Sequence, residues 1–111
     1  MKDYTPEELA QGQLDAYNAH DLDRFCSFFS EDISIFDAHT RALMFSGMES
    51  FRARYTKTFS NPDLHCTLVH RMVQDNIVID QESVVGLGSD VVTAIAIYHT
   101  KENKIHEVYF Y

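Results

Sequence analysis

Asp37 stands at the end of a short segment in which apolar and polar residues alternate. The run Ile33-Ser34-Ile35-Phe36-Asp37 predicts a strand with Ile33, Ile35 and Asp37 on one face. A carboxyl group on an apolar face is desolvated, which raises its pKa and suits it to act as a general base. In the alternative interpretation, Asp37 closes an edge strand and caps the loop 38–45 by accepting hydrogen bonds from backbone amides.

Gln13 is a second polar residue in apolar surroundings. The run Thr5-Pro6-Glu7-Glu8 has the N-cap threonine, N1 proline and N3 glutamate of a capping box, so we expect a helix that continues to about Ala19. Gln13 falls on the apolar side of that helix together with Tyr17. Its amide could stabilise an oxyanion, or it could be an inert side chain bonded to Tyr55 or to backbone.

Two more helices are expected before the chain becomes rich in strands. Asp21 can cap a short helix whose phenylalanines repeat at helical spacing. Ser46-Gly47-Met48-Glu49 has the form of a second capping box, and the apolar stripe of the helix that follows includes Tyr55. Asn61-Pro62 should end this third helix.

A meander of four strands is expected after Pro62, over residues 64–73, 77–85, 91–99 and 105–111. If residues 101–104 form the last hairpin turn, three pairs lie opposite one another on the face that the helices cover. These pairs are Ile95 with Phe110, Ile97 with Val108, and His99 with His106.

The predicted His99/His106 pair could shuttle protons, bind a metal ion or form a polar rim to a cavity. Two imidazoles with no third ligand in view make a weak metal site, and we therefore expect no metal here. His39 could orient the Asp37 carboxylate or stand in solvent on its loop.

The opposite face of the meander is also largely apolar in this register. It carries Ala94, Ala96, Tyr98, Tyr109 and Tyr111. A sheet that is apolar on both faces must be covered on both, and three helices cover one, so the pattern predicts a homodimer packed through the outer face. Asp80 and Glu82 fall on this outer face as well, where a charged interface rim is the simplest account.

Composition narrows the class of partner. The 111 residues fit one domain, 1–111, and 45% of them are hydrophobic, which is enough to form a core. A formal charge of −8 disfavours nucleic acid and anionic membrane surfaces as partners.

A polar start and the lack of a long apolar run favour a cytoplasmic location. In that compartment Cys26 and Cys66 are expected to be buried free thiols.

The order helix, helix, strand, helix, meander resembles the nuclear transport factor 2-like (NTF2-like) superfamily. The markers are Tyr17-Asn18-Ala19-His20-Asp21-Leu22-Asp23 leading into Phe28-Phe29-Ser30-Glu31-Asp32, Gly47 before the third helix, and the final aromatic strand. Within this superfamily, the chain is most similar to two branches, the SnoaL-type polyketide cyclases and the ketosteroid isomerases. The resemblance implies an α+β cone, also described as cystatin-like, in which three N-terminal helices pack in a curved mixed or antiparallel sheet around a hydrophobic pocket.

The isomerase resemblance implies roles for individual positions. It places the base at Asp37 and the oxyanion donors at Gln13 and about Ile95, where the isomerases have a tyrosine and an aspartic acid. It places Tyr55 inside the pocket and Gln81 and Ser83 at lining positions.

Two functional hypotheses follow. In the first, the chain is an isomerase, cyclase or hydratase that uses Asp37 as general base on a small apolar molecule, without a cofactor. In the second, the same fold is a non-catalytic ligand-binding or dimeric interaction module. The expected pocket comprises Gln13, Tyr17, Tyr55, Gln81, Ser83, Ile95, Ile97, His99, His106, Val108 and Phe110.

Overall fold

The first two helices begin at the caps that the sequence predicts. In the computed structural model, which describes residues 3–111, Thr5 Oγ1 accepts a hydrogen bond from the Glu8 amide at 3.1 Å and Glu8 Oε1 accepts one from the Thr5 amide at 2.9 Å. This capping box begins α1 (Pro6–Asn18). Asp21 is the N-cap of α2 (Leu22–Ser27), where its Oδ1 accepts a hydrogen bond from the Arg24 amide at 3.2 Å.

The third helix begins differently from the prediction. Gly47 is the N-cap of α3 (Met48–Phe59), with φ of 89° and no side-chain cap hydrogen bond, so the predicted Ser46/Glu49 capping box is wrong. Ser46 is instead the last residue of a strand, where it pairs with Ser34. Glycine suits the cap because only it adopts a left-handed backbone readily.

Six strands form one mixed sheet. They are β1 (Phe29–Asp37), β2 (Leu43–Ser46), β3 (His65–Gln74), β4 (Ile77–Val85), β5 (Val92–Lys101) and β6 (Lys104–Phe110). Their order is β2-β1-β6-β5-β4-β3, and β1 and β6 run parallel while all other neighbours run antiparallel. The four-stranded meander is confirmed, whereas β2 lies within the segment that was expected to be a loop.

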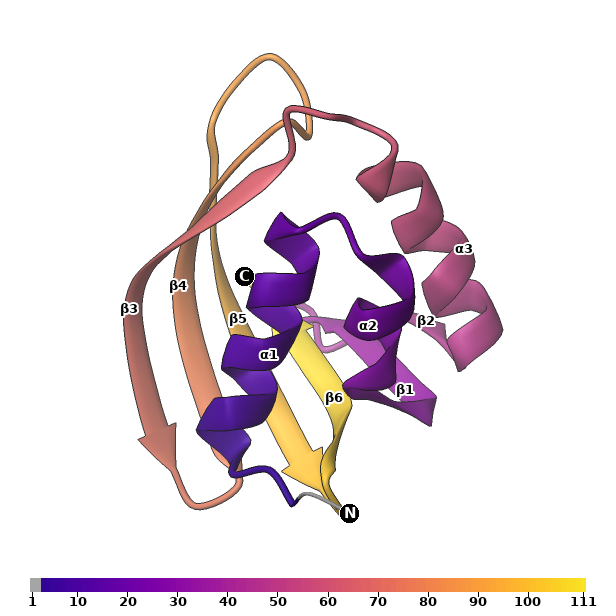
Figure 1. Cartoon of the computed structure of the whole chain (residues 1–111). Coiled ribbons are helices and arrows are strands. Elements are labelled where there is room, and N and C mark those ends of the chain that lie inside the picture. Colours follow the sequence, from indigo (N-terminus) through magenta and orange to yellow (C-terminus); the bar gives the residue numbers. More distant parts are fainter. Residues whose placement is uncertain (1–2) are drawn as a thin grey trace.

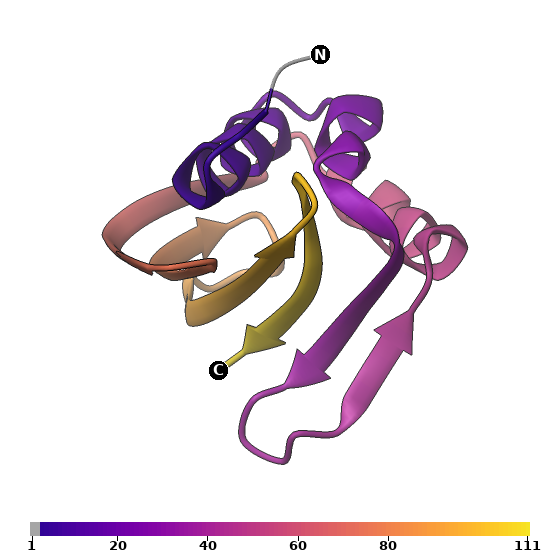
Figure 2. The same ribbon diagram turned by 90° about the horizontal axis from the view of Figure 1, so that it is seen from below.

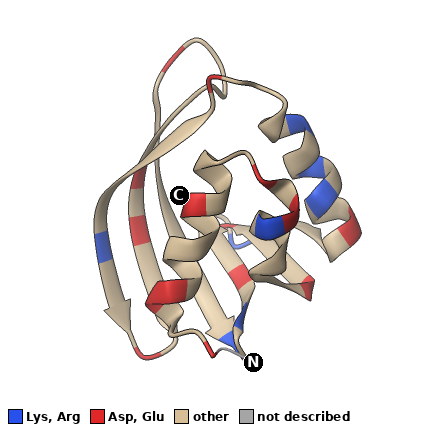
Figure 3. Cartoon of the chain, viewed as in Figure 1, with Lys and Arg blue, Asp and Glu red and all other residues tan. Residues whose placement is uncertain are grey.

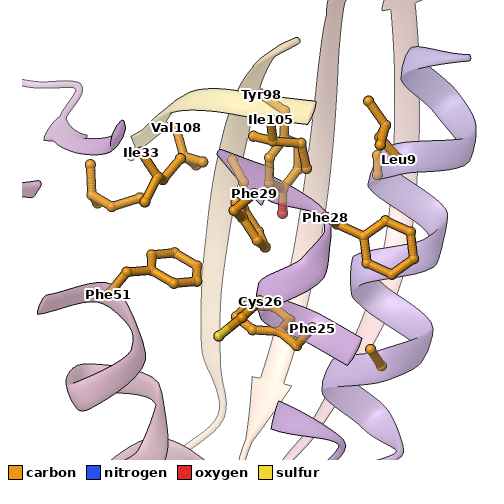
Figure 4. Close-up of a cluster of buried hydrophobic side chains, with 14 of the residues drawn as sticks. Leu9, Phe25, Cys26, Phe28, Phe29, Ile33, Phe51, Tyr98, Ile105 and Val108 are labelled. Carbon is orange, nitrogen blue, oxygen red and sulfur yellow. The ribbon is translucent and has the colours of Figure 1, made fainter. Parts of the chain in front are cut away.

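The three helices lie on one side of the curved sheet, which does not close (Figures 1 and 2). Helix α1 packs over β3 and β4, and α3 packs over β1 and β2. Figure 4 shows Phe51 from α3, Phe25 from α2 and Leu9 from α1 in the main buried cluster. In the described part of the chain, no helix is long and apolar enough to cross a membrane.

A β-bulge in the last hairpin reverses the predicted faces of two strands. Thr100 pairs with Ile105, but His99 pairs with Glu107, so His106 is an extra residue that has no partner in the ladder. Ile97 therefore lies opposite Tyr109 and Tyr98 opposite Val108, and the predicted Ile97/Val108 pairing is wrong. A one-residue slip moves each side chain of a strand to the other face.

The slip exchanges the inner and outer residues of β4 and β5. Asp80, Glu82, Ala96 and Tyr98, which were expected outside, are buried. Ile95 is 37% exposed, although it was expected to be inside. Tyr109 lies on the outer face as expected, because it pairs with Ile97 and stacks on Phe36.

Gly86 fixes the end of β4 against the start of β3. It has φ of 89°, and a Cβ there would lie 2.5 Å from the backbone of Leu64. Its carbonyl oxygen accepts a hydrogen bond from Asn61 Nδ2 at 2.6 Å. Both the backbone angle and the close approach therefore require glycine.

We expect Gly86→Ala to lower the free energy of unfolding by about 2 kcal/mol or more, because it adds backbone strain and a backbone clash. Gly88→Ala is the matched control, since a Cβ at Gly88 meets nothing within 4 Å. Urea denaturation of both variants measures the difference. Equal stability of the two variants would contradict this account of Gly86.

Candidate functional site

A cavity of about 230 Å³ lies between the helices and the inner face of the sheet. Most of its wall is apolar and includes Phe25, Phe29 and Phe51, which belong to the buried cluster in Figure 4. Its lining residues are Gln13, Leu14, Tyr17, Phe25, Phe29, Ile35, Phe51, Arg54, Tyr55, Thr58, Cys66, Glu82, Val84, Leu87, Val92, Ala94, Tyr98, Val108 and Phe110.

Glu82 supplies a carboxyl group to this cavity. Its side chain comes from the middle of β4, points inward and is 7% exposed. The pKa of Glu82 is raised from 4.5 to about 7, and burial is the largest cause. A hydrogen bond from Cys66 and the charge of Arg71 lower this pKa, and the neighbouring Asp80 raises it. At neutral pH the group is therefore poised between the acid and the carboxylate, as a proton-transfer group must be.

Asp80 stands two residues before Glu82 on the same face of β4, but its carboxylate has an arginine as partner. Arg71 of β3 binds it with two hydrogen bonds, from Nε to Oδ1 at 2.7 Å and from Nη2 to Oδ2 at 2.9 Å. Arg71 also donates from Nη1 to Gln11 of α1 at 2.8 Å. Asp80 thus lies in a buried ion pair, and Arg71 also joins the sheet to α1. Glu82 has no ion-pair partner among residues 3–111.

The Cys66 thiol lies beside Glu82. Cys66 Sγ donates to Glu82 Oε2 at 3.3 Å, and burial together with the adjacent carboxyl raises the pKa of the thiol well above its ordinary value. A thiol with a raised pKa is a poor nucleophile at neutral pH. Cys66 and Cys26 are both buried and free, as expected.

Tyr98 places a hydroxyl group in the cavity from β5. Gln13 Nε2 donates to that hydroxyl at 3.1 Å and to the Ala10 carbonyl at 2.9 Å. Because the Tyr98 oxygen accepts from Gln13 and has no acceptor for its own proton among residues 3–111, that proton can be donated to a ligand. Burial raises the pKa of Tyr98 well above its ordinary value, so the hydroxyl stays protonated.

Tyr17 and Tyr55 add two more hydroxyl groups to the wall. Burial raises the pKa of Tyr55 to about 12 and raises that of Tyr17 as well. Tyr17 packs edge-on against Phe59, and Tyr55 packs against Phe25 and Phe51. Aromatic packing therefore fixes both rings, and both hydroxyls remain neutral donors at physiological pH.

Several residues expected in the pocket do line the cavity. They are Gln13, Tyr17, Tyr55, Val108 and Phe110. The others do not line it: Gln81, Ser83, Ile95, Ile97, His99 and His106. Gln81 and Ser83 pair with Ile95 and Thr93 on the outer face of the sheet. They lie there because the β-bulge at His106 exchanges the inward-facing and outward-facing residues of β4 and β5.

The structure places Asp37 outside the cavity lining. Its Oδ1 accepts hydrogen bonds from the amides of His39 at 2.8 Å and Thr40 at 3.3 Å. Its backbone closes the same turn through Arg41 and Ala42. This geometry matches the interpretation in which Asp37 caps the loop. His39 contributes its backbone amide to that cap, and the His39 ring packs on Tyr111.

His99 and His106 border a separate polar depression of about 330 Å³ rather than facing each other across a ladder. His106 Nδ1 lies 3.3 Å from Asp32 Oδ1, and His99 Nδ1 lies 4.0 Å from Glu107 Oε1. Within residues 3–111, no group of three or more His, Cys, Asp or Glu side chains is arranged to hold a metal ion.

Sequence reasoning missed Glu82, Cys66 and Tyr98 as cavity residues. An acidic residue in an alternating strand is normally placed outside, and both faces of Ile77–Val85 contain apolar residues. The signal that could have found Glu82 is indirect. Arg71 on the neighbouring strand is a possible partner for Asp80, and an inward Asp80 places Glu82, two residues later, on the same face.

Comparison with known proteins identifies the fold and the family. The SnoaL-like domain model matches residues 10–108. An uncharacterised cystatin-fold protein from Novosphingobium aromaticivorans is 22% identical, with a TM-score of 0.87 over 97% of this chain and 98% of that one. A search of curated proteins found no match.

Two other solved structures share the fold. A candidate ketosteroid isomerase from Kribbella flavida is 14% identical, with a TM-score of 0.80 over 95% of this chain and 75% of that one. A candidate polyketide cyclase from Pseudomonas putida is 22% identical, with a TM-score of 0.72 over 97% and 91% of the two chains. At these identities the structures establish a shared architecture, and the match over residues 10–108 places the chain in the SnoaL-like domain family.

Proposed function

We propose that the chain is an enzyme that moves a proton on a small, mostly apolar carbonyl compound, as isomerases, cyclases and hydratases do. The observation that carries this proposal is a buried carboxyl, Glu82, in an apolar cavity that also contains the Tyr98 hydroxyl. The proposal moves the general base from Asp37 to Glu82, because Asp37 is bonded within its own turn.

The proposed reaction needs a base and an oxyanion donor, and both come from the chain. The Glu82 carboxylate takes a proton from the carbon beside the carbonyl, and the electron pair of the C–H bond forms an enolate. The Tyr98 hydroxyl, held by Gln13, donates a hydrogen bond to the enolate oxygen. Protonated Glu82 then returns the proton to another carbon, so no electrons are gained or lost.

The alternative is a binding module in which the same cavity holds an apolar ligand without chemistry. The hydrogen bonds from Cys66 to Glu82 and from Gln13 to Tyr98 favour it, because each gives a cavity side chain one partner in the absence of substrate. The two functions differ in one measurable respect: a binding module does not accelerate proton exchange on the molecule that it holds.

We also propose that two copies of the chain pack through the outer face of the sheet. Cross-strand pairing places an apolar row over all six strands on that face, opposite the helices (Figure 2). The row consists of Leu43, Phe36, Tyr109, Ile97, Ile79 and Met72. Leu43 is 55% exposed and Met72 is 63% exposed, so nothing among residues 3–111 covers these two side chains.

Deuterium exchange tests the role of Glu82. The probe is 2-tetralone, a neutral bicyclic ketone with acidic protons beside its carbonyl, followed by NMR in deuterated water. We expect the protein to accelerate exchange and Glu82→Gln to reduce that acceleration by about 10²–10⁴-fold. The rate should rise with pH through about 7, because the base form of Glu82 is the carboxylate.

Asp37→Asn is the matched variant for this experiment. It keeps an oxygen that can accept the turn hydrogen bonds, and we expect the wild-type rate of exchange. If Asp37→Asn loses the activity and Glu82→Gln keeps it, Asp37 is the base. If 2-tetralone binds without accelerated exchange, the binding module is the better description.

Glu82 should also make stability depend on pH. In the unfolded chain Glu82 ionises near 4.5, whereas in the folded chain it keeps its proton to about pH 7. Wild-type stability should therefore fall between these values as pH rises, relative to Glu82→Gln, by up to about 3 kcal/mol. Urea denaturation of both proteins at about pH 5 and about pH 8 measures this difference, and an unchanged difference would mean that Glu82 ionises normally.

The dimer has a direct test in Ile97→Lys. A lysine in the middle of the apolar row should convert a dimer to a monomer, because its charge would be buried without a partner. Ser50→Lys on the exposed side of α3 is the control and should leave the dimer intact. Native mass spectrometry at micromolar concentration measures the assembly, and a wild-type monomer would show that the proposed interface is wrong.

A further inference from the structure

Arg54 brings a positive charge to the wall of a cavity that is otherwise mostly apolar. It is one of two charged residues among the lining residues, and the other is Glu82. Arg54 is exposed, as are the lining residues Leu87 and Val92, which are 51% and 41% exposed. These three side chains therefore mark the mouth of the cavity, whereas Glu82 lies inside it.

The Arg54 guanidinium has no acidic partner within the described residues. Arg71 binds Asp80, and Arg52 Nη1 binds Asp23 Oδ1 at 2.7 Å, whereas no carboxylate lies within ion-pair distance of Arg54. Arg24 and Arg41 also have no carboxylate within ion-pair distance among the described residues, but of these three arginines only Arg54 lines the cavity. Its charge is thus available to a ligand.

The local structure holds Arg54 in place. Its Cζ lies 5.0 Å from the centre of the Phe45 ring, which is a cation–π distance. Thr58 is four residues further along α3 and also lines the cavity, so its hydroxyl lies on the same side of the helix. Arg52 and Lys57 also lie on α3, and Figure 3 shows the basic residues along this helix with an acidic residue at its start.

We propose that the ligand of this cavity carries one anionic group, such as a carboxylate, on a small apolar body. The anionic group binds Arg54 at the mouth, and the apolar body lies among the phenylalanines with its carbonyl toward Glu82 and Tyr98. A guanidinium binds a carboxylate through two parallel hydrogen bonds, which also orients the ligand. The inference rests on the proposed function, because it assigns the substrate class of the same cavity.

Two probes of equal shape test the inference by isothermal titration calorimetry. They are 2-naphthoate, which is anionic, and 2-naphthamide, which is neutral. We expect the protein to bind 2-naphthoate about tenfold more tightly, which is the size of one charge-assisted interaction. Arg54→Gln should abolish this preference without changing the affinity for 2-naphthamide.

Lys57→Gln is the matched control, because Lys57 lies on the same helix but does not line the cavity. It removes the same net charge and should keep the preference for 2-naphthoate. Equal binding of the two probes by the wild type, no binding of either probe, or an undiminished preference in Arg54→Gln would each overturn the proposal. Circular dichroism melting curves confirm that each variant is folded.

These outcomes are separate from those of the exchange experiment. If 2-tetralone exchange is absent but the Arg54-dependent preference is present, the cavity is an anion-selective binding site without the proposed chemistry. If exchange depends on Glu82 but no preference is found, the proton-transfer function remains and the anionic substrate class is wrong.

Discussion

Strand β4 places two acidic side chains on the buried face of the sheet, and Arg71 binds only the first of them. Asp80 is 0% exposed and receives two hydrogen bonds from that arginine, which makes its charge tolerable in the interior. Glu82 receives a thiol hydrogen bond instead, which is too weak to hold a full charge in an apolar cavity. The pKa of Glu82 therefore rises to about 7. The proposed chemistry of the cavity depends on this difference in partners, because Asp80 binds an arginine and Glu82 does not.

The same arginine connects the cavity to the architecture. Because Arg71 also binds Gln11, it joins β3, β4 and α1, and α1 carries Gln13 toward Tyr98. A change at Arg71 would leave the Asp80 charge buried without a partner and would also remove one hydrogen bond between β3 and the helix that orients the oxyanion donor. Polar contacts of this kind act as a unit, so the ion pair and the hydroxyl donor are expected to be coupled energetically.

The parts of the fold that depend on local chemistry could be predicted from the sequence. The caps at Thr5 and Asp21 begin helices where expected, and the meander has the expected strands. The inner face of β5 could not be predicted from the sequence. One bulged residue, His106, shifts the pairing between β5 and β6 by one residue and so exchanges the expected faces of the β5 side chains, and both faces of the strand carry apolar side chains. Gln13, Tyr17 and Tyr55 were found because helical periodicity is insensitive to such a slip, whereas Glu82 was placed on the wrong face together with its strand.

The position of the acidic group along the chain matters less than the medium around it. Asp37 ends β1, where backbone amides of a turn satisfy its oxygens, so it already has the partners that stabilise a carboxylate. Glu82 comes from the middle of a strand that the helices cover, where it is 7% exposed and accepts no hydrogen bond from a backbone amide of the described residues. The neighbouring cation, Arg71, is bound to Asp80 and not to Glu82. In this chain Asp80 engages that cation, and this arrangement leaves Glu82 able to exchange its proton.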